Sequence, residues 1–475
     1  MRNWSKLRAA AGFAGAHATL LGVIWLAASL LYVVVFAGIE RPAWLVVDLA
    51  LIAGGIVLLT RRWAVLGLSV VTARRFIAIA AVATACVLVS QLLVPDRHAI
   101  YLDETNYLAT LRGQTLLDGI VPFNLRWLSP FLAGRWNLLP VTDAPALAAI
   151  NFGALAVTGT YLTLLLLRIG VSRMIAWAAP VFLLGSYLGS YAAMNRLVLD
   201  PFNYALIIVL VHALVRAEHA RFAPWILLLA TCNSEKAVYW IPMFAVFELM
   251  RRARPWSWRD LVASLGAAVR GGAPALIYLL ALALYLRGSA VDNSGTAPEI
   301  LFRMGFSWLD PEFYDATAYT TASQTLWFPF GAFTVYAVLG LVYARDRWAH
   351  ALFVFLLPVM AQTLLGRDTE RMAAYSFVVY LPLGALYLTR ALSEFPPRLA
   401  KLMFTALLAV CVLQHYLLPF AARLRAVHVP FAVLLVTRPH TAQLILSAAE
   451  VLVVGAFVWL HLAVYGRDVL HPRRV

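Results

Sequence analysis

Long, uninterrupted runs of apolar residues constrain this chain more than any other feature. Runs of about 18 to 24 residues recur along the sequence, and a helix of that length crosses a hydrocarbon layer of ~30 Å. The chain has 475 residues, of which 63% are hydrophobic and only 13% are charged. A water-soluble domain could not cover its surface with so few polar side chains. The sequence therefore predicts an all-α, polytopic membrane protein with about 12–14 membrane segments.

The predicted membrane segments follow one another with no sizeable soluble domain between them. The whole chain, 1–475, is therefore predicted to be one integral membrane domain. Its first apolar run follows a basic N-terminus but is too long for the apolar region of a signal peptide, so it is predicted to remain as a first helix. The segments are expected near 15–37, 44–60, 76–95, 144–167, 174–193, 198–215, 268–287, 325–343, 349–365, 372–389, 402–420 and 442–465, with an unusual stretch at 222–249.

Arginine placement predicts which side of the membrane each connection faces. The formal net charge is +15, but most of the excess lies at the ends of apolar runs, where positive charge marks the cytoplasmic side. Counting crossings from a cytoplasmic N-terminus puts the densest basic group, at 251–259, inside. We therefore predict a bacterial inner-membrane protein with cytoplasmic termini and two long periplasmic loops, 96–143 and 288–324. The same placement argues against nucleic acid as a partner and makes the lipid bilayer the surrounding of the chain.

The stretch 222–249 has arginines at both ends, so it begins and ends on the cytoplasmic side. It is only about 28 residues long, too short for two crossings of ~20 residues each. Its centre, Cys232 to Lys236, is polar. We predict two short helices that meet at a turn partway through the membrane, where irregular backbone needs protein or a water-filled cavity around it. The alternative is one long tilted helix with a snorkelling Lys236, which the flanking arginines disfavour.

Two adjacent carboxylates, Asp103 and Glu104, open the first long outward loop. Asp103 is suited to cap a short amphipathic helix that runs through Leu111, with Tyr107, Leu108 and Leu111 forming an apolar face that lies on the bilayer. Because neighbouring helical residues point in different directions, the two carboxylates are not expected to share one task. A single positioned carboxylate suffices as general base for an acceptor hydroxyl. Capping and catalysis therefore both stay open as roles for Asp103.

Several charged residues stand at unusual places on the predicted outward side. Arg126 lies in an aromatic stretch of the first loop, where it either anchors the interface or lines a substrate cavity. Arg196 and Asp200 are four residues apart and so are spaced to pair on one helical face. Because a free carboxylate at a membrane boundary is costly, these two form either a structural pair or the polar wall of a cavity.

Lys236 is one of only three lysines and the only one predicted within the membrane. Ionisable groups at such depth usually face a pathway or a partner, and the nearest partner in sequence is Glu235. A compact ammonium at the start of a short helix also suits a phosphate group. Arg367 and Arg371 lie in a short outward connection, and Arg371 opens the next segment, so they too are candidates for binding an anion.

These features together resemble the GT-C superfamily of membrane glycosyltransferases. The shared features are a basic N-terminus, a carboxylate pair opening the first large outward loop, and a lysine between two half-helices. The resemblance covers about residues 76–390, which it marks as a GT-C-like core module, with additional C-terminal helices at 391–475. The chain departs from the family in one respect, because its carboxylate pair follows the third predicted segment, whereas the family usually carries the pair after the first. The similar phrases are Asp103-Glu104-Thr105-Asn106-Tyr107 and Gly119-Ile120-Val121-Pro122.

The resemblance implies transfer of a sugar from a polyprenyl-phosphate donor to an acceptor glycan, lipid or protein on the periplasmic side. Asp103 resembles the catalytic base, with Glu104 beside it, and Lys236, Arg371 and Arg367 resemble ligands of the donor phosphate. Some relatives screen the phosphate with Mg²⁺ or Mn²⁺, but the sequence offers no evident metal site, and two basic residues would serve instead. Contacts to the substrate or its cavity are expected from Tyr107, Arg126, Arg196, Asp200 and Glu235.

Two other functions remain open from the sequence. A transporter or lipid flippase would use broken helices at mid-membrane, with Lys236, Glu235, Asp200 and Arg196 lining the path. Against it, the chain has no inverted repeat, and a transporter has little need for two long outward loops. A lipid-linked glycan polymerase or ligase would hold pyrophosphate with outward arginines late in the chain. The segment 421–441 carries only Arg423, Arg425 and Arg438 for that purpose.

Overall fold

The computed structural model shows a helical protein, and no strand occurs among the residues that it describes. Within the described part of the chain, four helices are long and apolar enough to cross a membrane. They overlap the segments predicted near 76–95, 144–167, 268–287 and 372–389. The described residues are 22, 24–32, 70–93, 102–112, 126–135, 143–215, 220–252, 257–287, 330, 332–343, 354, 356, 374–409, 452, 455 and 459. The four long apolar stretches are Arg74–Leu92 in α3 (Val70–Leu93), α6 (Asp143–Arg168), Trp258–Leu284 in α13 (Trp258–Arg287), and Ala374–Ser393. The last of these comprises the 3-10 helix η9 (Ala374–Ser376) and α19 (Phe377–Ser393).

One predicted segment is not a single helix. The run near 174–193 forms α7 (Arg173–Trp177), α8 (Ala179–Leu184) and α9 (Tyr187–Met194) instead. Pro180, which has no N–H to donate, is the second residue of α8, where a helix needs no N–H from it. Gly189 lies against the backbone of Leu184, where any side chain would overlap it. The prediction of one continuous helix is wrong here, because a uniformly apolar run conceals local breaks in the backbone.

The predicted count of segments and their orientation stay predictions, because several segments lie wholly or largely outside the described residues. Those segments are near 44–60, 349–365 and 442–465. The second long loop, 288–324, also lies outside them.

The chain divides into two compact units, each assembled from separate stretches of sequence. In the second unit, α16 (Ala332–Tyr343) packs along α19, and Gly340 touches the backbone of Leu383. The first unit comprises Met1–Val89, Arg97–Thr163 and Asn195–Gly305 and carries most of the described candidate site residues; the second comprises Ser90–Asp96, Leu164–Met194 and Phe306–Val475.

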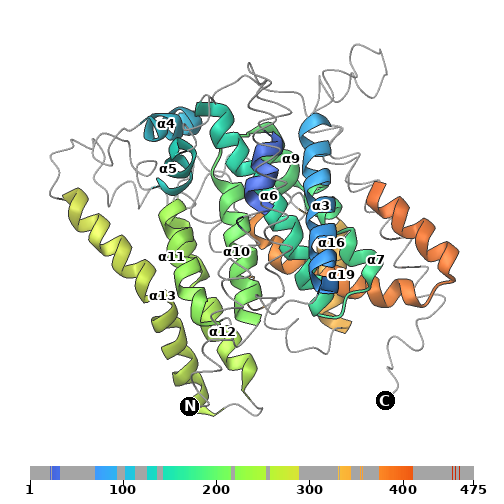
Figure 1. Cartoon of the computed structure of the whole chain (residues 1–475). Helices are drawn as coiled ribbons and strands as arrows, with labels where there is room; N and C mark the ends of the chain where they lie inside the picture. The colour runs from blue at the N-terminus through green and yellow to red at the C-terminus, as the bar shows by residue number, and fades with distance from the viewer. Residues whose placement is uncertain are drawn as a thin grey trace, which may run out of the picture. The chain divides into compact units, whose positions relative to one another are not determined.

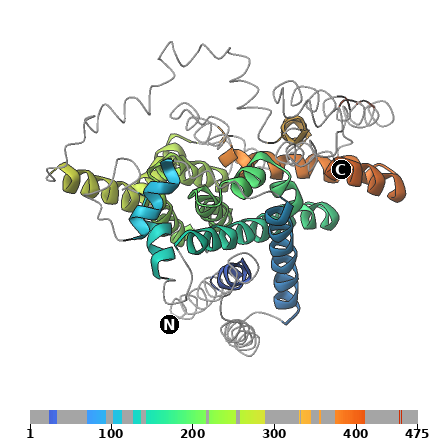
Figure 2. The same ribbon diagram turned by 90° about the horizontal axis from the view of Figure 1, so that it is seen from above.

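Four helices of the first unit run side by side (Figure 1). They are α10 (Asp200–Val215), α11 (Ala223–Asn233), α12 (Pro242–Arg251) and α13. Two short helices, α4 (Leu102–Leu111) and α5 (Leu128–Arg135), pack on each other, and α5 contacts α11. The view from above shows this pair beside the same group of helices (Figure 2). α4 coincides with the short helix that the sequence predicts through Leu111, while the side of the membrane that it faces stays a prediction.

The stretch 222–249 folds as the two short helices that its length and charges predict. α11 ends at Asn233, Ser234 is extended, the 3-10 helix η4 (Glu235–Trp240) makes the turn, and α12 returns. We call this segment, 223–251, the helical hairpin and its residues 233–236 the hairpin tip. At 1.5 Å per residue α11 rises only ~16 Å, about half the thickness of a hydrocarbon layer. Pro242, near the start of α12, has no N–H and so favours a helix start there.

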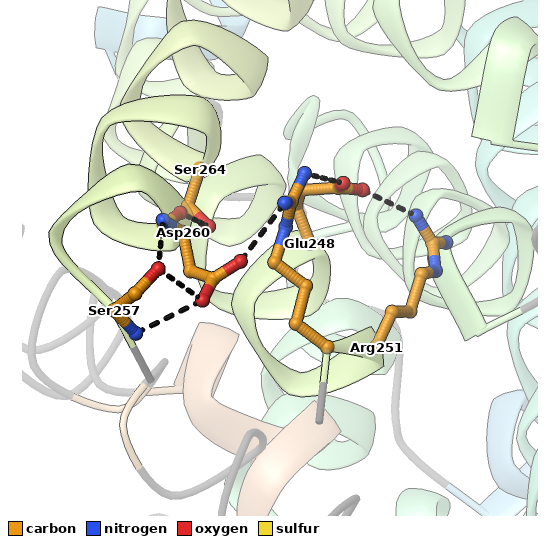
Figure 3. Close-up of polar contacts among 6 residues, drawn as sticks. Glu248, Arg251, Ser257, Asp260 and Ser264 are labelled. Carbon is orange, nitrogen blue, oxygen red and sulfur yellow. Dashed lines mark hydrogen bonds and ion pairs between the residues drawn. The ribbon is translucent and has the colours of Figure 1, made fainter. Parts of the chain in front are cut away.

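A charged network ties the open end of the hairpin, its base, to the start of α13 (Figure 3). The Arg252 guanidinium lies 2.9 Å from one oxygen of Glu248 and 3.0 Å from Asp260. Arg251 pairs with Glu248 at 3.4 Å and donates to the Leu214 carbonyl at the end of α10. Three helices are therefore joined at the hairpin base.

The same network contains the start signal of α13. The Ser257 hydroxyl and backbone N–H donate to Asp260 at 2.7 and 2.9 Å, while the Asp260 N–H donates back to the Ser257 oxygen at 3.2 Å (Figure 3). This reciprocal capping satisfies N–H groups that the first turn of a helix leaves without partners. The start of α13, and with it the hairpin base, is therefore fixed by local sequence.

Two glycines allow α13 to approach the hairpin closely. A methyl group on Gly271 would overlap the ring of Phe244, and one on Gly272 would lie 2.8 Å from Ile241. Gly266, one turn earlier, has only the far end of the flexible Arg270 side chain within 4 Å, at 3.4 Å. The contact between α12 and α13 thus depends on the absence of side chains at 271 and 272.

We predict that Gly271→Ala destabilises the protein by about 1–3 kcal/mol through overpacking. Gly266→Ala should be neutral or stabilise by up to ~1 kcal/mol, since alanine favours the helix. Unfolding by SDS in mixed micelles measures both variants. Equal stability of the two would contradict the close packing of α12 on α13.

Candidate functional site

α4 presents a buried face to its neighbours. Tyr107 is fully buried, and Leu108 and Leu111 are each only 7% exposed, so the three predicted residues do share one face, but that face does not lie on the bilayer as predicted. Protein covers this face, because α5 packs on α4. Gly134 of α5 would place a methyl group 3.2 Å from the Leu111 carbonyl, which shows how closely the two helices approach. The sequence of α5 thus permits the packing that fixes the position of α4.

A buried ion pair joins the first loop to the hairpin tip. Arg126 donates from Nε to one oxygen of Glu235 at 3.0 Å and from Nη2 to the other at 2.6 Å. Its Nη1 donates to the Tyr107 hydroxyl at 3.1 Å. This is the two-pronged geometry in which a planar guanidinium binds a carboxylate most strongly. Arg126 therefore connects α4 to η4 through one side chain.

Arg126 keeps its charge in this setting. Burial by itself lowers the pKa of Arg126. Attraction to the Glu235 carboxylate and the contacts with Tyr107 together raise this pKa by more than burial lowers it, so it stands well above its ordinary value. The arginine side chain is 5% exposed and that of Glu235 is 19% exposed. A charge so little exposed is stable only with its partner in place.

A second set of hydrogen bonds lies beside the ion pair and involves Asn233, the last residue of α11. Its side-chain oxygen accepts from the backbone N–H of Ser129 at 3.2 Å and from the Ser129 hydroxyl. Its side-chain nitrogen donates to Asn203 at 3.1 Å and to the Leu199 carbonyl at 3.2 Å. Asn233 thus links α5, α10 and the end of α11, and it satisfies polar groups in buried surroundings.

Aromatic residues continue the contact toward α13. Trp127 donates its indole N–H to the Tyr278 hydroxyl at 2.7 Å. Its ring meets Phe131 edge to face, with 5.7 Å between centroids. Phe131 is 45% exposed, so this aromatic pair reaches the surface of the unit. The aromatic stretch predicted around Arg126 therefore anchors α5 to a long helix.

Lys236 is the second residue of η4 and is half-buried. It lies close enough to Glu235 to attract its carboxylate. The predicted attraction between the two neighbours is present, but the sequence did not reveal that Arg126 makes the direct hydrogen bonds to that carboxylate. These interactions bring Arg126, Glu235 and Lys236 together at the hairpin tip.

Arg196 and Asp200 do not lie on one helical face. Arg196 is in the turn that precedes α10, while Asp200 is the first residue of that helix and is 5% exposed. The predicted spacing argument therefore fails, because four residues separate the pair without a helix between them. Asn151 of α6 holds the turn by donating to the carbonyls of Arg196 at 2.8 Å and Val198 at 2.7 Å.

Asp103 and Glu104 belong to the first turn of α4, which begins one residue earlier, at Leu102. Asp103 therefore stands inside the helix and not at the expected capping position. The backbone of Asp103 lies one helical turn before that of Tyr107, which puts the two residues on the same side of α4. At its other end α4 is tied to α6, because Arg112 pairs with Asp143 at 2.7 Å.

Arg367 and Arg371, the other candidates for binding phosphate, lie outside the described residues. Within the described part of the chain, no group of three His, Cys, Asp or Glu side chains is arranged to hold a metal ion. The described residues that the structure brings together are Tyr107, Arg126 and Glu235, with Lys236 beside them. Arg196 lies in the turn before α10, and Asp200 is the first residue of α10.

Sequence reasoning missed the residues that hold this site in place. Ser129, Asn203 and Tyr278 are ordinary residues by type, and only their burial and contacts reveal their role. A weak signal existed for Asn203, which is an amide within an otherwise apolar run and needs a partner there. No protein-family model, curated protein or solved structure matches the chain.

We predict that Arg126→Gln destabilises the first unit by about 3 kcal/mol, because it leaves the Glu235 carboxylate buried without its partner. The double variant with Glu235→Gln should lose less than the sum of the two single variants. SDS unfolding of all four proteins gives the coupling free energy. A coupling near zero would mean that the two side chains are stabilised independently.

Proposed function

We propose that the chain is a GT-C-type glycosyltransferase of the bacterial inner membrane, with its site on the periplasmic side. It would transfer a sugar from a polyprenyl-phosphate donor to an acceptor glycan, lipid or protein. The observation that carries the proposal is the link from α4 to the hairpin tip through Tyr107, Arg126 and Glu235. That link relates the helix of the proposed base to the turn that bears the proposed phosphate ligand.

The described geometry supports separate roles for α4, which bears the proposed base, and the hairpin tip, which bears the proposed phosphate ligand. Tyr107 shares a side of α4 with Asp103, and its hydroxyl is held by Arg126. Arg126 is held in turn by Glu235, whose neighbour Lys236 supplies an ammonium suited to phosphate. A base and a phosphate ligand on elements that are locked together meet the requirement for fixed orientation of two reactants.

The proposed reaction is a single displacement. The acceptor oxygen forms its bond to the anomeric carbon as the bond between that carbon and the phosphate oxygen breaks. Asp103 takes the acceptor proton, and polyprenyl phosphate leaves with the electron pair, held by Lys236 together with Arg371 and Arg367. One displacement inverts the anomeric configuration. Glu104 is the second carboxylate of the same turn and stands beside the base.

A transporter or flippase is the second candidate, and one observation favours it. The hairpin consists of two short helices, α11 and α12, joined by a polar turn at η4. Transporters also place binding sites where helices are interrupted by irregular, polar backbone. Such a protein would move a lipid-linked or anionic substrate without changing it. Reconstituted vesicles that accumulate unaltered substrate would favour this function over the transferase.

We predict that Asp103→Asn lowers sugar transfer by about 10²–10⁴-fold, the range for loss of a general base, while donor binding is retained. The matched control is Glu394→Gln, an exposed carboxylate beyond the end of α19. Mass spectrometry of lipid-linked sugars and envelope glycans in a deletion strain identifies donor and acceptor. Complementation of that strain with each variant then measures the transfer. Full restoration by the Asp103 variant would remove this residue from the mechanism.

A further inference from the structure

α13 presents a wide apolar face that no described element covers. It contacts α11 and α12 with one side and stands at the outside of the group of four helices (Figure 1). On its other side Val269 is 69% exposed and Ile277 is 66% exposed, and Leu265, Leu280 and Leu284 are exposed as well. Because α13 is long and apolar enough to cross a membrane, lipid is the surrounding that suits these residues.

Arg270 interrupts this apolar face. Its side chain is exposed, and no carboxylate of the described ranges pairs with it. The one carboxylate in the sequence of α13, Asp260, is occupied by Arg252 and Ser257 at the hairpin base. A charged side chain on the apolar face of a membrane-length helix is costly unless it reaches water or an anionic partner. Arg270 therefore needs a partner from outside the described protein.

The Arg270 side chain runs back along α13 toward the start of the helix. A methyl group placed on Gly266, one turn earlier, would lie 3.4 Å from Nη1 of Arg270 and would meet no other part of the described packing within 4 Å. Long basic side chains bend in this way to bring their charge to the edge of the hydrocarbon. Gly266 thus leaves an open place on the helix surface directly beside the guanidinium.

The length of α13 places this guanidinium at the edge of the membrane. The helix has 30 residues. It therefore rises ~45 Å, whereas the hydrocarbon layer is only ~30 Å thick. A span that ends at Arg287 reaches its other boundary about 20 residues earlier, near Ala268. The backbone of Arg270 then lies just inside the hydrocarbon, and its guanidinium, one turn back, lies at the level of the lipid phosphates.

A second arginine lies on the same side of the helix. Arg259 precedes Gly266 by about two turns and Arg270 by about three, and Ile277 and Leu284 follow at intervals of about two turns, so all five lie in one row. We call these five residues the α13 row. Arg259 is exposed, and no described carboxylate pairs with it either. The α13 row therefore offers positive charge at the membrane edge and apolar surface next to it, which complements an anionic headgroup and its acyl chain.

We propose that the α13 row binds an anionic phospholipid of the leaflet next to the hairpin base, which is the cytoplasmic leaflet in the predicted orientation. The lipid phosphate lies on Arg270 beside Gly266, where a planar guanidinium can donate to two phosphate oxygens at once. An acyl chain follows Ile277 and Leu284. The proposal goes beyond the transferase function and does not rest on it, because it assigns no role to the hairpin tip.

Native mass spectrometry of the full chain in detergent tests this proposal, with phosphatidylglycerol as the probe and phosphatidylcholine of the same acyl length for comparison. Arg270→Gln should lower the affinity for phosphatidylglycerol by about fivefold, the loss expected for one arginine at an anionic lipid surface. Its effect on phosphatidylcholine, which carries no net charge, should be smaller.

The matched control is Arg75→Gln, which also removes an exposed arginine, near the start of the long apolar helix α3. This variant should bind phosphatidylglycerol as the wild type does. Equal losses for the two variants would mean that the lipid is attracted to positive charge in general, and the assignment to α13 would fail.

A second pair of variants tests the place beside the guanidinium without removing a charge. Gly266→Leu fills that place and displaces the Arg270 side chain, so the preference for phosphatidylglycerol over phosphatidylcholine should be lost. Gly266→Ala adds only a methyl group at an ordinary contact distance and should keep the preference. Both replacements are good helix formers, so both proteins should fold. A wild-type preference in the leucine variant would contradict the proposed position of the phosphate.

Two other results would also overturn the proposal. Inorganic phosphate that displaces phosphatidylglycerol at equal concentration would assign the arginine to a free anion. A dimer in the same spectra that Arg270→Gln dissociates would mean that a second copy of the chain covers this face. Because none of these measurements needs a sugar donor, failure of the lipid site and failure of the proposed transferase are separate outcomes.

Discussion

The ion pair between Arg126 and Glu235 is the interaction on which the arrangement of the first unit depends. Its two residues are 109 positions apart in the chain, and neither is stable in its buried place without the other. The pair can form only if α5 lies at the end of α11 and if η4 turns its first residue toward the loop. Tyr107 extends the same contact to α4. One guanidinium thereby sets the relation of three elements.

Asn233 makes the pair possible by ordering the backbone next to it. A helix that stops inside a bundle leaves carbonyl and N–H groups that need partners. The Asn233 side chain accepts from Ser129 and donates to Asn203 and the Leu199 carbonyl, so the place where α11 ends is defined by hydrogen bonds on both sides. Glu235 follows two residues later, and its direction toward Arg126 results from that fixed end.

The fold could be predicted from the sequence where the signal was local. The length of 222–249 and its flanking arginines indicated two short helices, and α11 and α12 have that form. The apolar spacing of Tyr107, Leu108 and Leu111 identified the buried face of α4. Local signals failed at 174–193, where composition hides the effect of Pro180, and at Arg196, where spacing implied a helix that does not exist.

The candidate site was less predictable, because its key contact is not local. From the sequence, the partner predicted for Glu235 was its neighbour Lys236. In the structure, the residue that donates directly to the Glu235 carboxylate is Arg126, from a distant loop. Nothing in the spacing of a chain indicates which of its many arginines will meet a given carboxylate. Ser129 and Asn203 were missed for the same reason, since their importance comes only from the amide of Asn233.

The two ends of the helical hairpin are held by different kinds of contact. At the base, two arginines pair with two carboxylates that are near in sequence, and the start of α13 is capped by its own first turn. At the tip, the Arg126–Glu235 pair and the amide of Asn233 join segments that are far apart in the chain. A base closed by local contacts forms wherever its sequence occurs, whereas the tip takes its form only when α4, α5 and α10 have packed around it. The geometry of the tip, which bears the proposed phosphate ligand, is therefore a product of the tertiary fold and not of the hairpin alone.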